Sequence, residues 1–216
     1  MRNRTKWDSN ISKHRQEFIE KGFELFSSKS IETVKLEEVA AASGHGVATL
    51  YRYFGTKAGL LVEISAWKWG EFFRENRKRR PQENLADMSA ADMFDFYLDS
   101  YLEVYRQQKA LLRFNQLFNI YLQTEAVDRE TVGRYQALMQ PIQDFFHVMY
   151  EKAKEDGTLR TDISEGEMFT STIHLMLAVV TRYAVGLVYQ PAEGFDDLKE
   201  LTLQKELLKR EYVVSP

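Results

Sequence analysis

The chain has 216 residues, 44% of them hydrophobic, and no cysteine, so it is a globular protein without disulfides, thiolate metal sites or cysteine nucleophiles. This length can hold one sizeable core, or a small domain joined to a larger one. The net charge of −3 excludes a uniformly basic protein, but residues 1–57 carry ten Lys and Arg against seven Asp and Glu, so the N-terminal quarter is mildly basic.

The first ten residues are polar and lack the apolar region of a secretory signal. The longest strongly apolar stretch, near residues 173–180, is too short to span a membrane. We therefore expect a cytoplasmic protein with no membrane partner.

Helical periodicity covers nearly the whole chain, without sustained strand-like alternation, and it predicts about nine helices. The first four predicted helices cover about residues 12–28, 36–42, 47–54 and 57–79. Pro81 stops the fourth helix, because proline lacks the N–H that a helix interior needs.

Further helices are predicted near residues 90–107, 110–123 and 129–156. Pro141 falls inside the third of these and should kink or divide it, and Gly157 suits a left-handed cap at its end. Ser164 and Glu167 have capping-box spacing for a helix that runs to about Tyr189. The last helix covers about residues 195–213.

Residues 36–54 indicate two short helices joined by a glycine-containing turn, the layout of a helix-turn-helix. Leu50 and Phe54 are four residues apart and share one face of the second helix. The remaining positions are small, or carry donors for phosphates and bases: Val47, Ala48, Thr49, Tyr51 and Arg52. An ordinary helical hairpin has the same spacing, so the pattern alone leaves both readings open.

Residues 15–61 resemble the DNA-binding domain of TetR-type regulators. The residues that carry the resemblance are Leu25-Phe26, Val39-Ala40, Gly44, Thr49-Leu50-Tyr51, Tyr53-Phe54, Lys57 and Leu60-Leu61. Beyond this quarter of the chain, the resemblance is one of size and helical layout, plus the Gly-x-Leu-Arg-x-Asp stretch at residues 157–162.

The resemblance implies a role for each matching residue. Val47 and Ala48 would face the bases, whereas Thr49, Tyr51 and Lys57 would hold the phosphate backbone, with the helix dipole at Lys57 adding to the attraction. Arg52 would contact either a base or a phosphate. The expected DNA-binding residues are Lys35, Val47, Ala48, Thr49, Tyr51, Arg52, Tyr53 and Lys57.

No motif in the sequence indicates catalysis, a cofactor or a metal site. Asp144 and His147 are three residues apart, but no second pair and no His-Glu-x-x-His motif accompanies them. Phosphate loops, dinucleotide fingerprints and nucleophile elbows are also absent from the sequence. We therefore expect a protein that is not an enzyme.

Aromatic residues are dense behind the helix-turn-helix, and most of them should form the core. Buried tyrosine hydroxyls, and a buried Asn115, His147 or His174, would need polar partners. An apolar cavity with a few polar groups is the usual form of a small-molecule site. The expected effector-binding residues are Trp67, Tyr97, Tyr101, Asn115, Phe118, His147, His174 and Tyr183.

The predicted fold is therefore all-α. Residues 1–56 would form a three-helix DNA-binding domain, and residues 57–216 a larger helical domain for ligand binding and dimerisation. The resemblance implies a homodimeric repressor that binds a palindromic operator in double-stranded DNA and is released by a small apolar or aromatic effector. The leucines expected in a dimer interface of the last two helices are Leu198, Leu201, Leu203, Leu207 and Leu208.

Two alternatives stay open. One is a helical ligand-binding or interaction protein with degraded DNA affinity. Three departures favour it: Lys35 and Gly46 at helix-capping positions, and Glu37, whose charge phosphate would repel. The other alternative is a helical-bundle enzyme.

Overall fold

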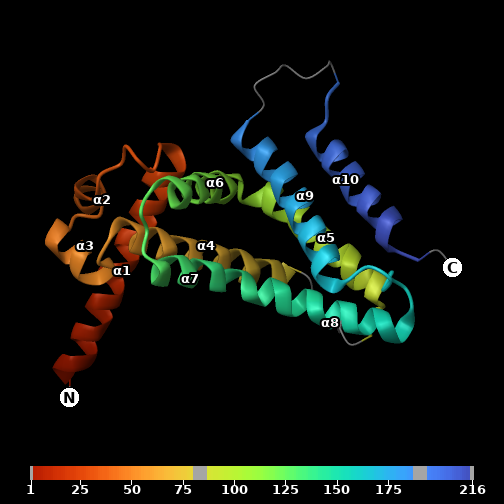
Figure 1. The fold of residues 1–216 in the computed structure, drawn as a ribbon. Coiled ribbons are helices and arrows are strands. Elements are labelled where there is room, and N and C mark those ends of the chain that lie inside the picture. Colours follow the sequence, from red (N-terminus) through yellow and green to blue (C-terminus); the bar gives the residue numbers. More distant parts are fainter. Residues whose placement is uncertain (1, 80–86, 187–193, 215–216) are drawn as a thin grey trace. The chain divides into compact units, whose positions relative to one another are not determined.

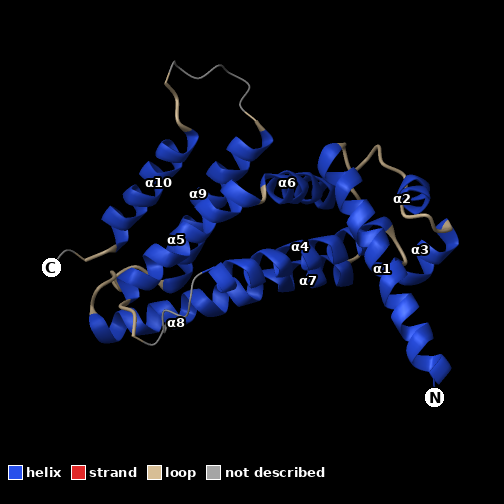
Figure 2. Cartoon of the chain, turned by 180° about the vertical axis from the view of Figure 1, so that it is seen from behind, coloured by secondary structure: helices blue, strands red, loops and turns tan. Residues whose placement is uncertain are grey.

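The computed structural model describes residues 2–79, 87–186 and 194–214. Its elements there are ten α-helices and one short 3₁₀ helix (Figure 1). Loops join them, and the described part contains no strand (Figure 2). The all-α prediction is confirmed.

The first four helices are α1 (Arg2–Ser28), α2 (Leu36–Ala42), α3 (Val47–Phe54) and α4 (Lys57–Arg79). The bounds of α2, α3 and α4 agree with those predicted from the sequence. Helix α1 begins at Arg2 rather than near residue 12, because residues 2–11 contain no glycine or proline to interrupt a helix.

The later helices are α5 (Ala90–Gln107), α6 (Lys109–Thr124), α7 (Arg129–Gln136), the 3₁₀ helix η1 (Ala137–Met139), α8 (Gln140–Asp156), α9 (Glu165–Val185) and α10 (Asp197–Tyr212). Pro141 lies in the first turn of α8, where a missing N–H costs nothing, so the long predicted segment is divided there. This division explains why the structure has ten α-helices where about nine were predicted.

Two predicted helix caps are confirmed. Gly157 ends α8 in the left-handed conformation, with φ of 67°, and the Ser164 hydroxyl accepts a hydrogen bond from the Glu167 backbone N–H at 3.3 Å. Helix α9 ends at Val185, whereas its predicted end at Tyr189 lies outside the described residues.

The chain forms two compact units that are discontinuous in sequence. The first unit comprises Met1–Glu71 and Arg113–Leu138, and the second unit comprises Phe72–Leu112 and Met139–Pro216. The boundaries between them therefore fall within α4, within α6 and within η1. The functional boundary expected after residue 56 stays a prediction.

The core of the first unit joins α1 to α4. Phe18 and Phe26 of α1, and Leu60 and Ile64 of α4, have no exposed side-chain surface. Gly22 permits this packing, because a Cβ atom at that position would lie 2.8 Å from Cδ1 of Ile64.

In the second unit, α5 packs against α8, α9 and α10. Lys205 of α10 is buried, and its Nζ atom lies 3.0 Å from Oδ2 of Asp95 and 2.6 Å from Oδ1 of Asp99 on α5. A buried ammonium group needs such partners, so these ion pairs fix where α10 packs on α5.

A short antiparallel bridge ties the C-terminal residues to the loop that precedes α9. Leu159 pairs with Val213, the Arg160 N–H donates to the Tyr212 carbonyl at 2.9 Å, and the Val214 N–H donates to the Thr158 carbonyl at 3.0 Å. The Arg160 side chain also reaches Glu211, at 2.6 Å.

Helix α9 is long and apolar enough to cross a membrane by length and composition alone, and no other helix in the described residues is. Its most apolar window has a mean hydropathy of 1.3, and 33% of that window is buried. The helix is longer than the apolar stretch near residues 173–180 considered in the sequence. One such helix is weak evidence for a membrane span, because core helices of soluble proteins share this composition.

Candidate nucleic-acid interface and ligand groove

Helix α3 has one buried face and one exposed face. Leu50 is fully buried and Phe54 is 8% exposed, so this face holds the helix against the first unit. On the other side Tyr51 is 47% exposed, and Ala48 and Arg52 are also exposed. The short helix therefore carries a small residue, a phenol and a guanidinium together on its exposed side.

The turn between α2 and α3 is held by backbone hydrogen bonds. The Gly44 N–H donates to Ala41 at 3.1 Å, and the His45 N–H donates to Ala40 at 3.0 Å. Gly44 has φ of +74°, a conformation that costs side-chain-bearing residues more than glycine. This geometry is the helix-turn-helix that the sequence predicted.

Lys35 is the N-cap residue that precedes α2, and its side chain is exposed. The Glu38 carboxylate accepts a hydrogen bond from the Lys35 backbone N–H at 3.0 Å, so an acidic residue caps this helix. Lys35 is thus free to face a phosphate. Glu37 is exposed on the same turn and would oppose that attraction.

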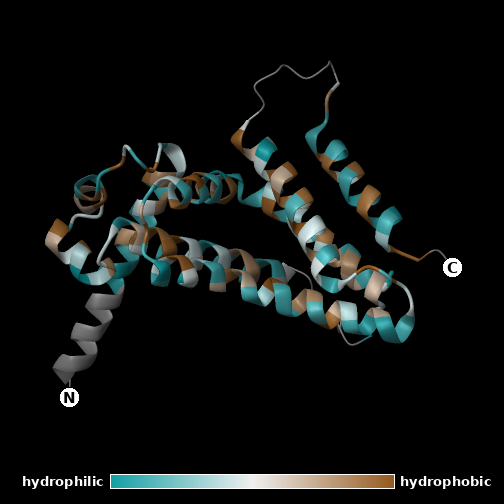
Figure 3. Ribbon diagram, viewed as in Figure 1, coloured by the Kyte–Doolittle hydropathy of each residue, from teal (hydrophilic) through white to brown (hydrophobic). Residues whose placement is uncertain are grey.

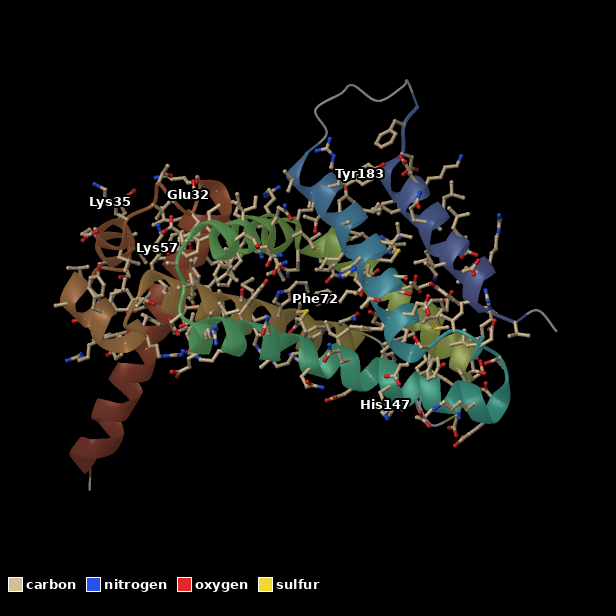
Figure 4. All side chains as sticks on the ribbon, in the orientation of Figure 1. Glu32, Lys35, Lys57, Phe72, His147 and Tyr183 are labelled. Atoms are coloured by element: carbon tan, nitrogen blue, oxygen red, sulfur yellow. The ribbon has the colours of Figure 1, made fainter. Side chains whose placement is uncertain are left out.

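Lys57, the first residue of α4, is half-buried and lies close to Glu32 (Figure 4). Its Nζ atom lies 3.4 Å from the Glu32 carbonyl oxygen and 5.7 Å from the ring centres of Phe26 and Tyr121. Burial lowers the pKa of its ammonium group from the usual value. Lys57 therefore already interacts with groups of its own chain, in addition to any phosphate that it would contact.

The other predicted DNA-binding residues of α3 are less exposed. Val47 and Thr49 are half-buried. The Tyr53 ring packs 6.1 Å from those of Phe18 and Phe54, and its enclosed hydroxyl has no hydrogen-bond partner. Arg52 covers the outer side of the Tyr53 ring at 5.4 Å.

The predicted effector residues are divided between the two units. Trp67, Asn115 and Phe118 belong to the first unit. The five others belong to the second unit: Tyr97, Tyr101, His147, His174 and Tyr183.

An open groove of about 570 Å³ lies between α6 and α7 of the first unit. Its lining residues are Gln116, Asn119, Ile120, Leu122, Gln123, Val132, Tyr135 and Gln136. We call it the amide groove. Four amides and a phenol can donate and accept hydrogen bonds there, and none of these lining groups carries a charge at neutral pH.

Tyr135 connects the amide groove to two of the predicted effector residues. Its hydroxyl lies 2.8 Å from the side-chain oxygens of both Asn115 and Asn119, and burial raises its pKa. The Phe118 ring packs edge-on against the Tyr135 ring at 4.7 Å. Asn115 and Phe118 thus contact Tyr135, which lines the groove, without lining the groove themselves.

Tyr97 and Tyr101 satisfy each other's polar groups. Both side chains are buried, their hydroxyl oxygens lie 2.6 Å apart, and burial raises both pKa values. The pair therefore needs no ligand to satisfy its hydroxyls. Tyr183 lies elsewhere in the second unit, stacked on Phe195 with ring centres 5.9 Å apart.

The expected burial of His147 and His174 is wrong. Both side chains are exposed, and Figure 4 shows His147 at the outer edge of α8. His147 Nδ1 lies 3.0 Å from a Glu165 carboxylate oxygen, which raises the pKa of the imidazole. Both histidines fall on outward positions of their helices, which periodicity did not identify because apolar residues flank them.

Trp67 is half-buried and packs edge-on against Phe23, with ring centres 6.3 Å apart. It does not line the amide groove. Tyr135 and the amides of this groove were not predicted from the sequence. Gln116, Asn119 and Gln123 recur at helical spacing, and that repeat of uncharged polar residues was the available signal.

Hydrophobic residues recur along α9 and α10 (Figure 3), and several of their side chains are exposed. Leu175 and Val185 of α9 are 38% and 51% exposed, and Leu203 and Leu207 of α10 are 50% and 45% exposed. Leu201 and Leu208 were expected in an interface between two chains, but both are buried within their own chain. Only one side of α10 therefore remains available to a partner.

Residues 17–64 match the family model for bacterial regulatory proteins of the tetR family. No curated protein sequence matches the chain.

Solved structures of bacterial regulators have the same fold. NalD from Pseudomonas aeruginosa, the secondary repressor of the MexAB-OprM multidrug efflux pump, superimposes with a TM-score of 0.66 at 17% identity, over 96% of this chain and 100% of NalD. A tetR-family protein from Rhodococcus RHA1 gives 0.67 at 16% identity, over 92% and 96%. FadR from Bacillus subtilis in complex with stearoyl-CoA gives 0.64 at 13%, over 89% and 96%.

Proposed function

We propose that the chain is a dimeric transcriptional repressor of the TetR family that releases a palindromic operator when a small molecule binds. The match of residues 17–64 to the tetR family model supports this proposal. The observation that carries the proposal is the two-sided α3, with Leu50 and Phe54 buried and Ala48, Tyr51 and Arg52 exposed beside a helix-turn-helix turn. Repression, rather than activation, of transcription is supported by the similar fold of NalD, which is a repressor.

The proposed DNA contacts are those expected from the sequence. Val47 and Ala48 would face base edges in the major groove, and Thr49, Tyr51, Arg52 and Lys35 would hold the adjacent phosphates and bases. Lys57 would contact a phosphate while remaining packed on its aromatic neighbours, and Tyr53 would act mainly by supporting Arg52.

The proposed dimer interface is formed by the exposed sides of α9 and α10. Leu175 and Val185 are exposed on α9, and the exposed Leu203 and Leu207 are four residues apart on α10. Exposed apolar side chains in such numbers are typical of a protein–protein interface. A two-fold dimer would present two α3 helices to successive major grooves, about 34–36 Å apart.

We place the effector in the amide groove, with Asn115 and Phe118 acting through Tyr135. The uncharged lining, with Ile120, Leu122 and Val132 as its apolar part, favours a neutral ligand that carries both polar and apolar groups. Trp67, Tyr97, Tyr101, His147, His174 and Tyr183 do not line this groove, and their role in effector binding stays a prediction.

The test is selection of bound sequences from a library of random DNA duplexes by the full-length protein at moderate salt. We expect a palindromic consensus, bound with an affinity that falls steeply as salt rises. Neutral amphipathic compounds that raise the melting temperature should then release the selected duplex, and Val132→Arg should weaken that release more than Val148→Arg, which alters α8. Binding no better than to bulk DNA would favour the alternative of a ligand-binding protein with degraded DNA affinity, to which Glu37 points.

A further inference from the structure

Two histidines and a glutamate from separate segments converge in the first unit. His14 and Glu17 lie one turn apart on α1, and His45 lies in the turn between α2 and α3. One nitrogen or oxygen atom of each residue lies within 4.8 Å of such an atom of the other two. We call these three residues the histidine cluster.

The contacts within the histidine cluster are close and partly shielded from water. His45 Nε2 lies 2.6 Å from Glu17 Oε2, the His14 and His45 ring centres are 4.2 Å apart, and all three side chains are half-buried. The Phe18 ring lies 5.2 Å from the His45 ring and closes one side with an apolar wall.

A simple ion pair between Glu17 and His45 does not account for His14. The His14 ring instead packs against the His45 ring, and two protonated imidazoles would repel each other. Two neutral imidazoles and a carboxylate, by contrast, are a common ligand set for Zn²⁺, with a fourth position left for water. Neighbouring donors around tetrahedral zinc are about 3.3 Å apart, so modest side-chain rotations would close the cluster around an ion.

We propose that the histidine cluster is a Zn²⁺ site that cross-links α1 to the helix-turn-helix turn. The nearby cation is Lys13, whose Nζ atom lies 3.8 Å from Glu17 Oε1. Lys13 is exposed, so its side chain can move into solvent when a metal ion arrives. A second group, formed by His147, Glu151 and Glu165, is more exposed and serves as the comparison.

A metal ion bound here would act on the start of α3. His45 is followed by Gly46, the N-cap residue of that helix, so a bond from the metal to His45 fixes the turn against α1. It also adds two positive charges close to the amino end of the helix that the proposed function places on DNA. Zn²⁺ therefore stabilises the first unit and tightens operator binding, and this second effect rests on the proposed function.

Zinc binding is tested on the full-length protein after chelator treatment, by calorimetric titration with Zn²⁺ and with Mg²⁺, which prefers oxygen ligands. We expect one tight Zn²⁺ site and a rise in melting temperature, with no response to Mg²⁺. His14→Gln, Glu17→Gln and His45→Gln should each weaken zinc binding at least about tenfold, because each removes one ligand. Glu20→Gln, an exposed neutralisation on the same helix, and His147→Gln should bind as the unmodified protein does.

Equal zinc affinity in the three cluster variants and the unmodified protein would overturn the site, as would loss of zinc binding in His147→Gln alone. The selected duplex provides the second measurement. Zn²⁺ should tighten duplex binding several-fold in the unmodified protein and not in His45→Gln, and an unchanged duplex affinity on zinc binding would overturn the link to DNA. A protein that binds zinc at the cluster but binds no duplex would contradict the proposed function and support the metal site.

Discussion

Lys205 of α10 lies with its Nζ atom 2.6 Å from Oδ1 of Asp99 on α5, although 106 residues separate the two in sequence. The same ammonium group contacts Asp95, and Lys209 lies 2.7 Å from the second oxygen of Asp95. Two lysines of α10 and two aspartates of α5 thus form one network.

Replacing Lys205 by methionine should lower the free energy of unfolding. The substitution keeps the length of the side chain but leaves Asp95 and Asp99 without their buried partner, at a cost of about 2 kcal/mol. Urea denaturation followed by circular dichroism measures the change. Lys199→Met on the exposed side of α10 is the matched control, and an equal loss in both variants would contradict the role given to burial.

The stability of the protein should fall in acid partly through Asp95. Burial opposes ionisation of this carboxyl group, but hydrogen bonds from Lys209 and Lys205 outweigh it and hold its pKa below the ordinary value of 3.8. The folded pKa is thus below the unfolded one, so this contribution is present above about pH 4 and is lost as the pH falls through the folded pKa. The loss of unfolding free energy in acid should be smaller in Asp95→Asn than in the unmodified protein. An equal loss in both would show that the Asp95 carboxyl does not have a lowered pKa in the folded state.

Gly59→Ala should destabilise the first unit by about 1–3 kcal/mol. A Cβ atom at Gly59 would lie 2.2 Å from the Phe54 backbone oxygen, which cannot move without disturbing the end of α3. Gly133→Ala on α7 is the control, because nothing lies within 4 Å of its added Cβ atom and alanine favours a helix by up to about 1 kcal/mol. The two melting temperatures should therefore move in opposite directions.

Operator binding should depend on the exposed side of α3. Arg52→Ala should reduce the dependence of affinity on salt by about one ion, as expected for one lost phosphate contact, and Tyr51→Phe should weaken binding by one hydrogen bond. Arg129→Ala removes a comparable exposed charge from α7 and should leave the salt dependence as it is. Fluorescence anisotropy across a salt series gives both quantities. Lys57 is less suitable, since its replacement would also disturb its packing on Phe26 and Tyr121.

Charged residues on the exposed side of α10 should dissociate the dimer. Leu203→Glu and Leu207→Glu would place carboxylates in an apolar interface, and sedimentation velocity at micromolar concentration should show monomers. Val148 on α8 is 58% exposed, so Val148→Glu controls for a new charge on an exposed apolar position. A stable monomer without any substitution would remove the proposed interface altogether.

Several helix ends and the buried side of α3 could be predicted from the sequence, because residues close by in the chain determine them. Pro141, Gly157 and Ser164 act on their own backbone or on residues a few positions away, so the division before α8, the end of α8 and the start of α9 could be predicted. The buried side of α3, with Leu50 and Phe54, could be predicted from their spacing of four residues.

The contacts between distant segments could not be read in that way. His45 meets Glu17 28 residues away, and Lys205 meets Asp95 110 residues away. Periodicity says which side of a helix is apolar, but it does not say which other helix covers that side. The pairing of Tyr97 with Tyr101 shows the same limit at short range, because their spacing of four residues was visible while the mutual hydrogen bond was not.

The bridge between Leu159 and Val213 changes how the C-terminal part of the chain can open. Chain ends usually fray first, because little holds them. Here the amide protons of Arg160 and Val214 are shared between the end of the chain and the loop before α9, so neither exchanges with solvent until both segments separate. Residues 158–160 and 212–214 must therefore separate together, and the exchange of the Arg160 and Val214 amide protons reports that local opening.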